Sequence, residues 1–462
     1  MRHRRLCIAT LLCVALLAVI ACHPSGSRDS RPLGTIDDVM RFAERDDTNV
    51  LFVLIDTLRA DHLSAYGYDR ETSPVIDQLA DSGVRFAHNV SQSSWTKCSM
   101  ASLWTGIYPS RTGVLRAPHV LSDDAKLPAE IFREAGFRTA GIWRNGWIAP
   151  NFGFGQGFEV YTQPKPSPRD RPKTQQAPNV TLPGSDTDII RSTHAFLRAH
   201  GHERWFAYLH LMDVHQYVYS ADEALFGTTY LDIYDNSIRW VDGLIGHLVG
   251  ELEDRGLREK TLIVIASDHG EAFGEHGSEG HARDIYGEVT ETPVVLSFPF
   301  RLETGIVVDT RTANVDVWPT VLELVGLPGL DDPDGSSRLA DVVAAANGAT
   351  ADPAQDGRFF AELDETWGRS ARKPQPLVAV NEGRWRLVYP SVRPNQAQLF
   401  DKHEDPAEQR DLATEHPEVV EQLVGVVEKH KAGRPPPWGE TQSIELDEME
   451  LNQLRALGYG VQ

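Results

Sequence analysis

The segment Asn49-Val50-Leu51-Phe52-Val53-Leu54-Ile55-Asp56 is a nearly continuous apolar run, rich in β-favouring residues, that ends at a carboxylate. Such a run predicts a strand that is buried on both faces, as the strands of covered parallel sheets are. Three comparable runs follow along the chain, at residues 139–143, 205–212 and 261–266. The four runs predict the strands at the centre of one sheet.

Amphipathic segments of helical period separate these runs, at residues 73–82, 127–135, 187–200 and 231–255. Strands that alternate with helices predict an α/β domain with a mostly parallel central sheet flanked by helices. Ligands bind such sheets at the carboxyl ends of the strands. The residues that follow each apolar run are therefore the candidate site.

Carboxylates and imidazoles stand at these strand ends. One such residue alone is more often a helix cap or a satisfied histidine, but their repetition at successive strand ends indicates a metal site. Carboxylate and imidazole ligands together suit zinc or manganese better than calcium, which prefers oxygen alone. The candidates are Asp56, His210, Asp213, His215, Asp268, His269 and, slightly further on, His281.

Composition excludes several classes of protein. The chain has 462 residues, 41% of them apolar and 24% charged, as in ordinary globular proteins. Its 45 basic and 66 acidic residues give a net charge of −21, which argues against nucleic acid as a partner. Three of the four cysteines lie in the first 22 residues, so a disulfide-built scaffold is excluded.

The N-terminus has the layout of an export signal, a basic start followed by an uncharged run from Leu6 to Ala21. This run is shorter than the roughly 20 residues that a membrane-spanning helix needs. Its end, Val19-Ile20-Ala21-Cys22, resembles the lipobox of bacterial lipoproteins, which implies lipidation of Cys22. An ordinary signal peptide or a short uncleaved anchor is the alternative. We expect export to a bacterial cell envelope and a lipid anchor in its membrane.

The predicted domain order follows from these patterns. A lipoprotein-type signal peptide covers residues 1–22, and a flexible tether rich in Ser, Pro and Arg covers 23–45. The catalytic domain covers 46–345. Residues 346–462 form a small α+β subdomain, with short strands at 359–363, 376–380 and 384–389 and a helix at 417–430.

Several motifs together resemble the sulfatase family of the alkaline phosphatase superfamily. They stand at residues 53–63, 66–68, 72–74, 95–110, 152–158, 210–215, 267–271, 286–288, 399–408 and 454–459. The resemblance implies an alkaline-phosphatase/sulfatase-like fold. It also implies a metal-dependent hydrolase or transferase of sulfate or phosphate esters.

The nucleophile position departs from the sulfatase pattern. Sulfatases convert the cysteine, or in some members a serine, of Cys-x-Pro-x-Arg to formylglycine, but Cys98 has neither the proline two residues on nor the arginine four residues on. In the family pattern that cysteine stands nine positions before the Thr of the Thr-Gly pair, and nine positions before Thr105 stands Thr96. We therefore expect Thr96 as nucleophile, no formylglycine, and Cys98 as a semi-buried filler. An N-cap role for Thr96 is the compatible alternative.

The resemblance implies a first metal held by Asp56, Thr96, Asp268 and His269. The pair Asp268-His269 replaces the Asp-Asn that is commoner in formylglycine sulfatases, and Thr57 replaces the second aspartate of their Asp-Asp pair. Members of the superfamily with a metal-bound threonine carry out phosphoryl chemistry. The two departures therefore favour zinc or manganese and phosphate esters.

The remaining site residues have less specific predicted roles. His215 and His281 would bind the ester oxygens or protonate the leaving group, or hold a second metal together with Asp213. Lys97 would place positive charge beside the reacting phosphorus. Candidates of lower rank are Arg59, Asn145, His210 and Glu275.

The sequence thus predicts a metal-dependent hydrolase that cleaves phosphate or sulfate esters through a metal-bound threonine, with phosphodiester chemistry favoured. An arylsulfatase-like sulfate hydrolase, a phosphoethanolamine-type transferase and an inactive surface binding protein are the alternatives. We expect small-molecule, glycan or lipid esters as substrates, contacted by loops at residues 161–182 and 216–230.

Overall fold

The computed structural model describes residue 29 and residues 31–167, 174–175, 184–350, 357–364, 376–446, 448 and 451–452. The predicted signal peptide, Cys22, most of the loop at 161–182 and the tail motif at 454–459 lie outside the described residues. Within the described part of the chain, no helix has the length and apolar character needed to cross a membrane.

One eight-stranded mixed sheet forms the centre of the molecule, as predicted. Its order is β16-β3-β14-β11-β2-β9-β6-β7, and β14 is antiparallel to both of its neighbours, whereas the other pairs are parallel. The bounds are β16 Ile306–Val308, β3 Val84–Phe86, β14 Val294–Ser297, β11 Thr261–Ala266, β2 Asn49–Ile55, β9 Trp205–Leu211, β6 Arg138–Trp143 and β7 Val160–Thr162.

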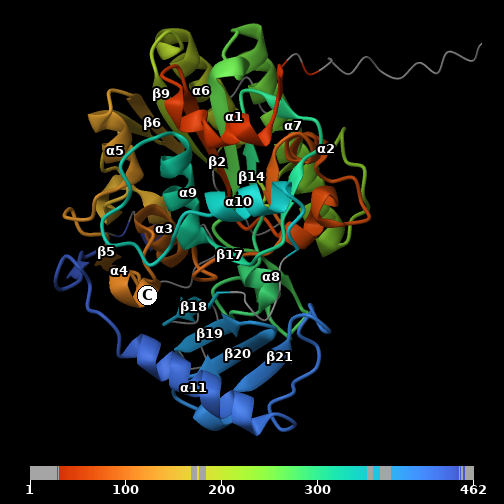
Figure 1. The fold of residues 1–462 in the computed structure, drawn as a ribbon, viewed down its shortest axis with the longest axis vertical. Helices are drawn as coiled ribbons and strands as arrows, with labels where there is room; N and C mark the ends of the chain where they lie inside the picture. The colour runs from red at the N-terminus through yellow and green to blue at the C-terminus, as the bar shows by residue number, and fades with distance from the viewer. Residues whose placement is uncertain are drawn as a thin grey trace, which may run out of the picture.

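Helices cover both faces of this sheet (Figure 1). Val50, Phe52 and Leu54 of β2 pack with α3, α5 and α9, whereas the alternate residues of β2 pack with α2, α6 and α7. The continuous apolar run of β2 is required because neither face meets water. The helices are α2 Pro74–Asp81, α3 Thr96–Thr105, α5 Pro128–Glu134, α6 Asp186–His200, α7 Tyr230–Asp254 and α9 Val317–Leu324.

The C-terminal subdomain is a four-stranded antiparallel sheet with one long helix on it, and Figure 1 shows it as a separate layer below the main sheet. Three of its strands and the helix were predicted; β21 was not. Beyond the helix, the chain returns to the catalytic domain, where β22 pairs with β5. The elements are β18 Phe359–Leu363, β19 Leu377–Glu382, β20 Trp385–Pro390, β21 Gln398–Asp401, α11 Pro417–Lys431, β22 Gln442–Ser443 and β5 His119–Val120.

The predicted flexible tether does not extend to residue 45. From Arg31 onward this segment is packed on the catalytic domain and forms β1 (Leu33–Gly34) and α1 (Ile36–Met40). Phe42 is buried, and its ring lies 5.5 Å from that of Phe298. The tether prediction is therefore wrong for residues 31–45. The segment is mostly polar, but its few apolar residues pack on the catalytic domain.

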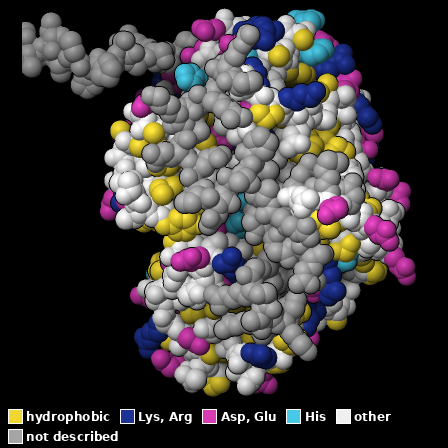
Figure 2. All heavy atoms as spheres, turned by 180° about the vertical axis from the view of Figure 1, so that it is seen from behind, with side chains coloured by type: hydrophobic (Ala, Val, Ile, Leu, Met, Phe, Trp, Pro, Cys, Tyr) yellow, Lys and Arg dark blue, Asp and Glu magenta, His cyan; other side chains and the backbone are white. Residues whose placement is uncertain are grey.

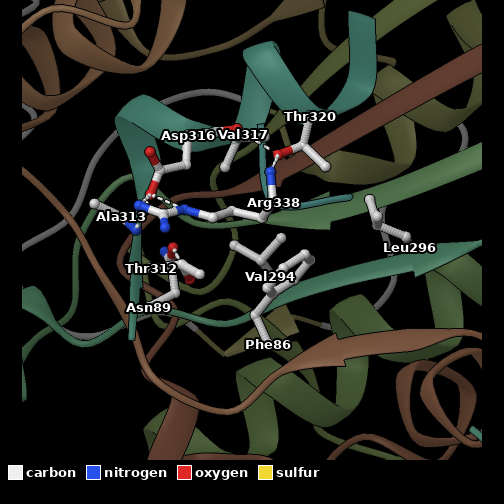
Figure 3. Close-up of a pocket in the computed structure, with 10 residues that line it drawn as sticks. All are labelled: Phe86, Asn89, Val294, Leu296, Thr312, Ala313, Asp316, Val317, Thr320 and Arg338. Atoms are coloured by element: carbon white, nitrogen blue, oxygen red, sulfur yellow. Dashed lines mark hydrogen bonds and ion pairs between the residues drawn. The ribbon is translucent and has the colours of Figure 1, made fainter. Parts of the chain in front are cut away.

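A small pocket lies beside the sheet, with walls from β3, β14, the strand β17 (Thr312–Ala313) and the α9 region (Figure 3). The charged groups that line the pocket pair with each other, since the guanidinium of Arg338 lies 2.8 Å from the carboxylate of Asp316. The backbone N–H of Arg338 donates to the hydroxyl of Thr320. None of the predicted site residues lines it, so the site lies elsewhere. On the face shown in Figure 2, basic and acidic side chains are intermixed.

Candidate active site

The ends of two neighbouring strands bring three predicted metal ligands together. Asp56 directly follows β2, and Asp268 and His269 come just after β11, which pairs with β2 in parallel. One ligand atom from each of the three lies within 4.8 Å of the others, and all three side chains are buried. The sheet register therefore builds the cluster that the sequence predicted.

Thr96 joins this cluster from the first residue of α3. Its Oγ1 lies 3.1 Å from Nε2 of His269. The first turn of the helix is held at the end of β11, because Ser99 Oγ donates to the backbone carbonyl of Asp268 at 2.6 Å. Trp95, and not Thr96, is the N-cap residue of this helix.

The three side chains fit a divalent cation. Nδ1 of His269 hydrogen bonds to the carbonyl of Gly270 at 2.9 Å, which leaves Nε2 as the nitrogen with a lone pair toward Thr96. Asp56 Oδ1 and Asp268 Oδ2 are buried and accept no hydrogen bond from the described residues. Buried carboxylate oxygens without donors are costly unless a cation neutralises them.

The other oxygen of Asp56 is fully engaged. Asn145 Nδ2 donates to Asp56 Oδ2 at 2.6 Å, and His210 Nε2 lies 2.9 Å from the same atom. Each partner is itself fixed, Asn145 by the backbone N–H of Trp147 and His210 by the hydroxyl of Tyr208 at 2.6 Å. Asn145 and His210, which ranked low in the sequence, thus orient the carboxylate directly.

The pKa values of the two carboxylates in the cluster are shifted in opposite directions. Burial raises the pKa of Asp56, but the nearby imidazoles of His215 and His210, the latter hydrogen-bonded to the carboxylate, outweigh burial and hold this pKa below its usual range. The pKa of Asp268 is raised by burial and by the negative charge of Asp56. Two buried carboxylates this close repel each other, which a bound cation would relieve.

His215 and His281 lie beside the cluster, as predicted. The ring centroid of His281 is 4.6 Å from that of His269 and 5.0 Å from that of His215. Burial lowers the pKa of His215 to about 4, so its imidazole is neutral at pH 7. Burial also disfavours the charged form of His281, but Glu271, 3.1 Å away, outweighs it and raises the pKa of His281. The pKa values of the two histidines are therefore shifted in opposite directions.

Backbone strain marks the same region. Thr57, Tyr217 and Ala282 have φ angles of 62°, 53° and 57°, in the left-handed region that residues other than glycine rarely adopt. They lie within two residues of Asp56, His215 and His281, respectively. Strain of this kind persists where the surrounding structure holds it, which is common at functional sites.

Lys97 has a different environment from the one predicted. Its side chain is buried, and Nζ donates to the carbonyl of Ala117 at 2.7 Å. The same atom lies 3.5 Å from the ring centroid of Phe152 and 5.4 Å from that of Trp147. One backbone carbonyl and two aromatic rings thus stabilise the ammonium group of Lys97. A contact with the reacting ester stays a prediction.

Asp213 is held by several hydrogen bonds, and its role as a ligand of a second metal stays a prediction. Its carboxylate is bound by Arg144 at 2.6 Å, by Trp240 Nε1 at 3.0 Å and by the backbone N–H of Asp186 at 2.9 Å. These three bonds fix the orientation of the carboxylate, with Oδ2 accepting two of them and Oδ1 one. Within the described residues, Asp56, Asp268 and His269 form the one group with the spacing of a metal site.

Arg59, Glu275 and Cys98 contact other parts of the protein. Arg59 and Glu275, both candidates of lower rank, bind each other at 2.5 Å. Cys98 is buried in the hydrophobic core, and burial raises the pKa of its thiol far above the ordinary value. A thiol of this kind is inert, and it is fully buried rather than semi-buried as predicted.

Comparison with known proteins places the chain in a family. The Sulfatase family profile matches residues 48–327, and that of N-sulphoglucosamine sulphohydrolase, C-terminal, matches residues 274–432. The first match spans more than half of the chain. The chain therefore belongs to the sulfatase family, whose members are hydrolases that act on ester bonds.

Individual relatives agree with this assignment. The chain is 23% identical to an N-acetylgalactosamine-6-O-sulfatase of Bacteroides thetaiotaomicron, over 83% of this chain and 93% of that protein. It is 30% identical to a choline-sulfatase of Rhizobium meliloti, over 39% of this chain and 32% of that protein.

Solved structures share the fold. A crystal structure of a putative sulfatase from B. thetaiotaomicron aligns with a TM-score of 0.69 and 16% identity, over 90% of this chain and 96% of that one. Phosphonate monoester hydrolase of Agrobacterium radiobacter aligns with a TM-score of 0.64 and 19% identity, over 83% and 95% of the two chains.

Proposed function

We propose that this protein is a metal-dependent ester hydrolase in which Thr96 is the nucleophile, with phosphodiesters as the favoured substrates. One observation carries the proposal: the hydroxyl of Thr96 lies 3.1 Å from Nε2 of His269, beside the buried carboxylates, whereas Cys98 lies in the core. A threonine hydroxyl needs such activation to act as a nucleophile.

Asp56, Asp268 and His269 would hold the cation, and their two carboxylates and one imidazole suit zinc or manganese. When bound, the cation supplies positive charge that lowers the pKa of a nearby hydroxyl and draws charge from the ester oxygens. Asn145 and His210 keep Asp56 in the orientation that leaves Oδ1 toward the cluster.

The reaction has two steps. Oxygen Oγ1 of Thr96, its proton lost to solvent, attacks phosphorus, and the bond from phosphorus to the leaving oxygen breaks while His281 gives that oxygen a proton. Water then attacks the phosphothreonine as His281 takes a proton back, which releases the product and restores Thr96. Neutral His215 hydrogen bonds to the ester oxygens during both steps.

Sulfate ester hydrolysis is the second candidate. It is favoured by the relatives, among them N-acetylgalactosamine-6-O-sulfatase and an ulvan-active sulfatase of Formosa agariphila. Their names also favour a glycan ester as substrate. Against it stands the sequence at 96–100, which lacks the pattern for formylglycine.

The deciding experiment compares three ester classes on the metal-loaded protein. Aryl phosphodiester, phosphomonoester and sulfate ester substrates with the same leaving group are assayed in parallel, and the bound metal is identified by elemental analysis. We expect the diester to be cleaved fastest. Efficient sulfate cleavage with negligible diester cleavage, or an aldehyde at position 98 in peptide mass spectrometry, would overturn the proposal.

Export and lipid anchoring through Cys22 form a separate proposal, supported by the sequence of residues 1–22. The chain is expressed with its N-terminus intact and the cells are fractionated, with Cys22→Ser as the comparison. We expect the unchanged chain in the membrane fraction and the variant released from it. Equal partition of the two would contradict lipidation.

A further inference from the structure

A line of hydrogen bonds runs from the surface to His281. Glu271, only 2% exposed, has Oε1 at 3.1 Å from Nδ1 of His281. Its other oxygen, Oε2, accepts a hydrogen bond from the hydroxyl of Tyr217 at 3.0 Å. The hydroxyl of Tyr230, a residue that is 42% exposed, donates to that of Tyr217 at 2.7 Å.

The backbone is fixed at both Tyr217 and His281, the two residues that bond to the carboxylate of Glu271. Tyr217 has a φ of 53°, and Ala282, directly after His281, has a φ of 57°. The backbone N–H of Ala282 donates to the carbonyl of Ser94 at 2.8 Å, two residues before Thr96. A strained backbone beside both the tyrosine and the histidine costs stability, and it persists only where the surrounding contacts enforce it.

We propose that Glu271 is a positioning residue for His281, and that Tyr217 in turn positions Glu271. Because Nδ1 of His281 is bonded to Glu271, the nitrogen that exchanges a proton with the leaving group is Nε2, across the ring. Glu271 fixes the rotation of the ring and the tautomer, as carboxylates do for imidazoles in other sites. This inference rests on the proposed role of His281 as proton donor.

The chain contains a matched comparison. His276 Nδ1 lies 2.7 Å from Glu288 Oε1, and the ring stacks on Tyr286 with centroids 3.9 Å apart. Its other nitrogen, Nε2, lies 2.9 Å from the carbonyl of Glu408, so this histidine is turned to the C-terminal subdomain. Glu288→Gln therefore replaces the carboxylate in the same kind of bond by a neutral amide, without touching His281.

The test measures kcat and KM of Glu271→Gln, Tyr217→Phe and Glu288→Gln on a series of aryl esters whose leaving groups differ in pKa. The esters are of whichever class the unchanged protein cleaves. For poor leaving groups, we expect Glu271→Gln to lower kcat about 10- to 100-fold with little change in KM. For the best leaving groups, which need no proton, the loss should shrink to about threefold or less.

The other two variants make the result specific. Tyr217→Phe, which keeps the ring, should give the same dependence on the leaving group with a smaller loss, and Glu288→Gln should show none. A loss that is equal for all leaving groups in Glu271→Gln overturns the proposal, as does the same dependence in Glu288→Gln. If thermal melting shows that Glu271→Gln does not fold, Tyr217→Phe is used as the test. A loss of kcat in Tyr217→Phe that does not change with the pKa of the leaving group then overturns the proposal.

Failure of this inference is distinguishable from failure of the proposed function. Thr96→Ala is measured in the same series, and full activity in that variant would remove Thr96 as nucleophile. How the loss of kcat in Glu271→Gln changes with the leaving group does not depend on which residue attacks or on which ester is cleaved.

Discussion

Oγ1 of Thr96 and Nε2 of His269 lie 3.1 Å apart, although 173 residues separate them in the sequence. The contact exists because α3 begins where β11 ends. Cys98 stands two residues further along the same helix, and side chains two apart on a helix do not face the same way. One therefore joins the polar cluster while the other enters the hydrophobic core.

This difference predicts opposite effects of two alanine substitutions. Thr96→Ala should lower kcat by at least about 1,000-fold, because loss of the proposed nucleophile would leave only residual catalysis. Cys98→Ala should keep kcat within about threefold and lower the free energy of unfolding by about 1 kcal/mol, the cost of a small cavity. Steady-state kinetics and urea unfolding measure both. An inactive but folded Cys98→Ala protein would contradict the assignment.

Asn145 gives a second prediction, on metal affinity. Asn145→Ala removes the donor 2.6 Å from Asp56 Oδ2, so the carboxylate loses part of its fixed orientation. We expect metal binding about 10- to 100-fold weaker, measured by competition with a chelator. Asn347→Ala is the control, since that exposed amide donates only within its own helix, to Val343. Equal affinities for the two variants would mean that Asn145 does not support the cation.

The sequence predicts the centre of the fold well, because the buried strands carry a strong local signal. The run at Asn49–Ile55 and the run at Thr261–Ala266 appear in the structure with the predicted bounds. Asp56, Asp268 and His269 then meet by the general rule that parallel strands end at one edge. Residues 31–45 were mispredicted because Val39 and Phe42 are too few to give a periodic signal.

The partners of each site residue could not be predicted in the same way. Asp213 reads as a possible ligand from the sequence alone, whereas its partner Arg144, 69 residues away, is brought to it only by the pairing of β6 with β9. Glu271 and Tyr217 carry no pattern that links them. Contacts of this kind depend on side-chain packing across elements, for which one sequence holds no local signal.

The ion pair between Arg144 and Asp213 leads to a third prediction. Arg144→Met leaves Asp213 and Asp186 buried without their cation, which should cost about 3 to 5 kcal/mol of unfolding free energy. Arg138→Met, on the same strand, removes more exposed ion pairs and should cost far less, because solvent screens them. Urea unfolding measures both. In addition, Asp213→Asn should leave the number of bound metal ions unchanged, and loss of one ion would identify Asp213 as a ligand.

The fourth prediction concerns stability against pH. Burial disfavours the charged form of His276, but hydrogen bonds to Glu288 and to the carbonyl of Glu408 outweigh burial and raise its pKa from 6.5 to about 9. A pKa raised by folding stabilises the fold fully below about pH 6.5, and this contribution is lost as the pH rises through about 9.

His276→Gln removes that contribution. The Tm of the unchanged protein should therefore fall more than that of the variant between about pH 6 and about pH 10, and the difference between the two proteins should be largest at the acidic end. His403→Gln, at an exposed histidine beside Glu404, is the control and should follow the unchanged protein. Parallel curves for the unchanged protein and His276→Gln would show that the bond between His276 and Glu288 does not depend on the charge of the imidazole.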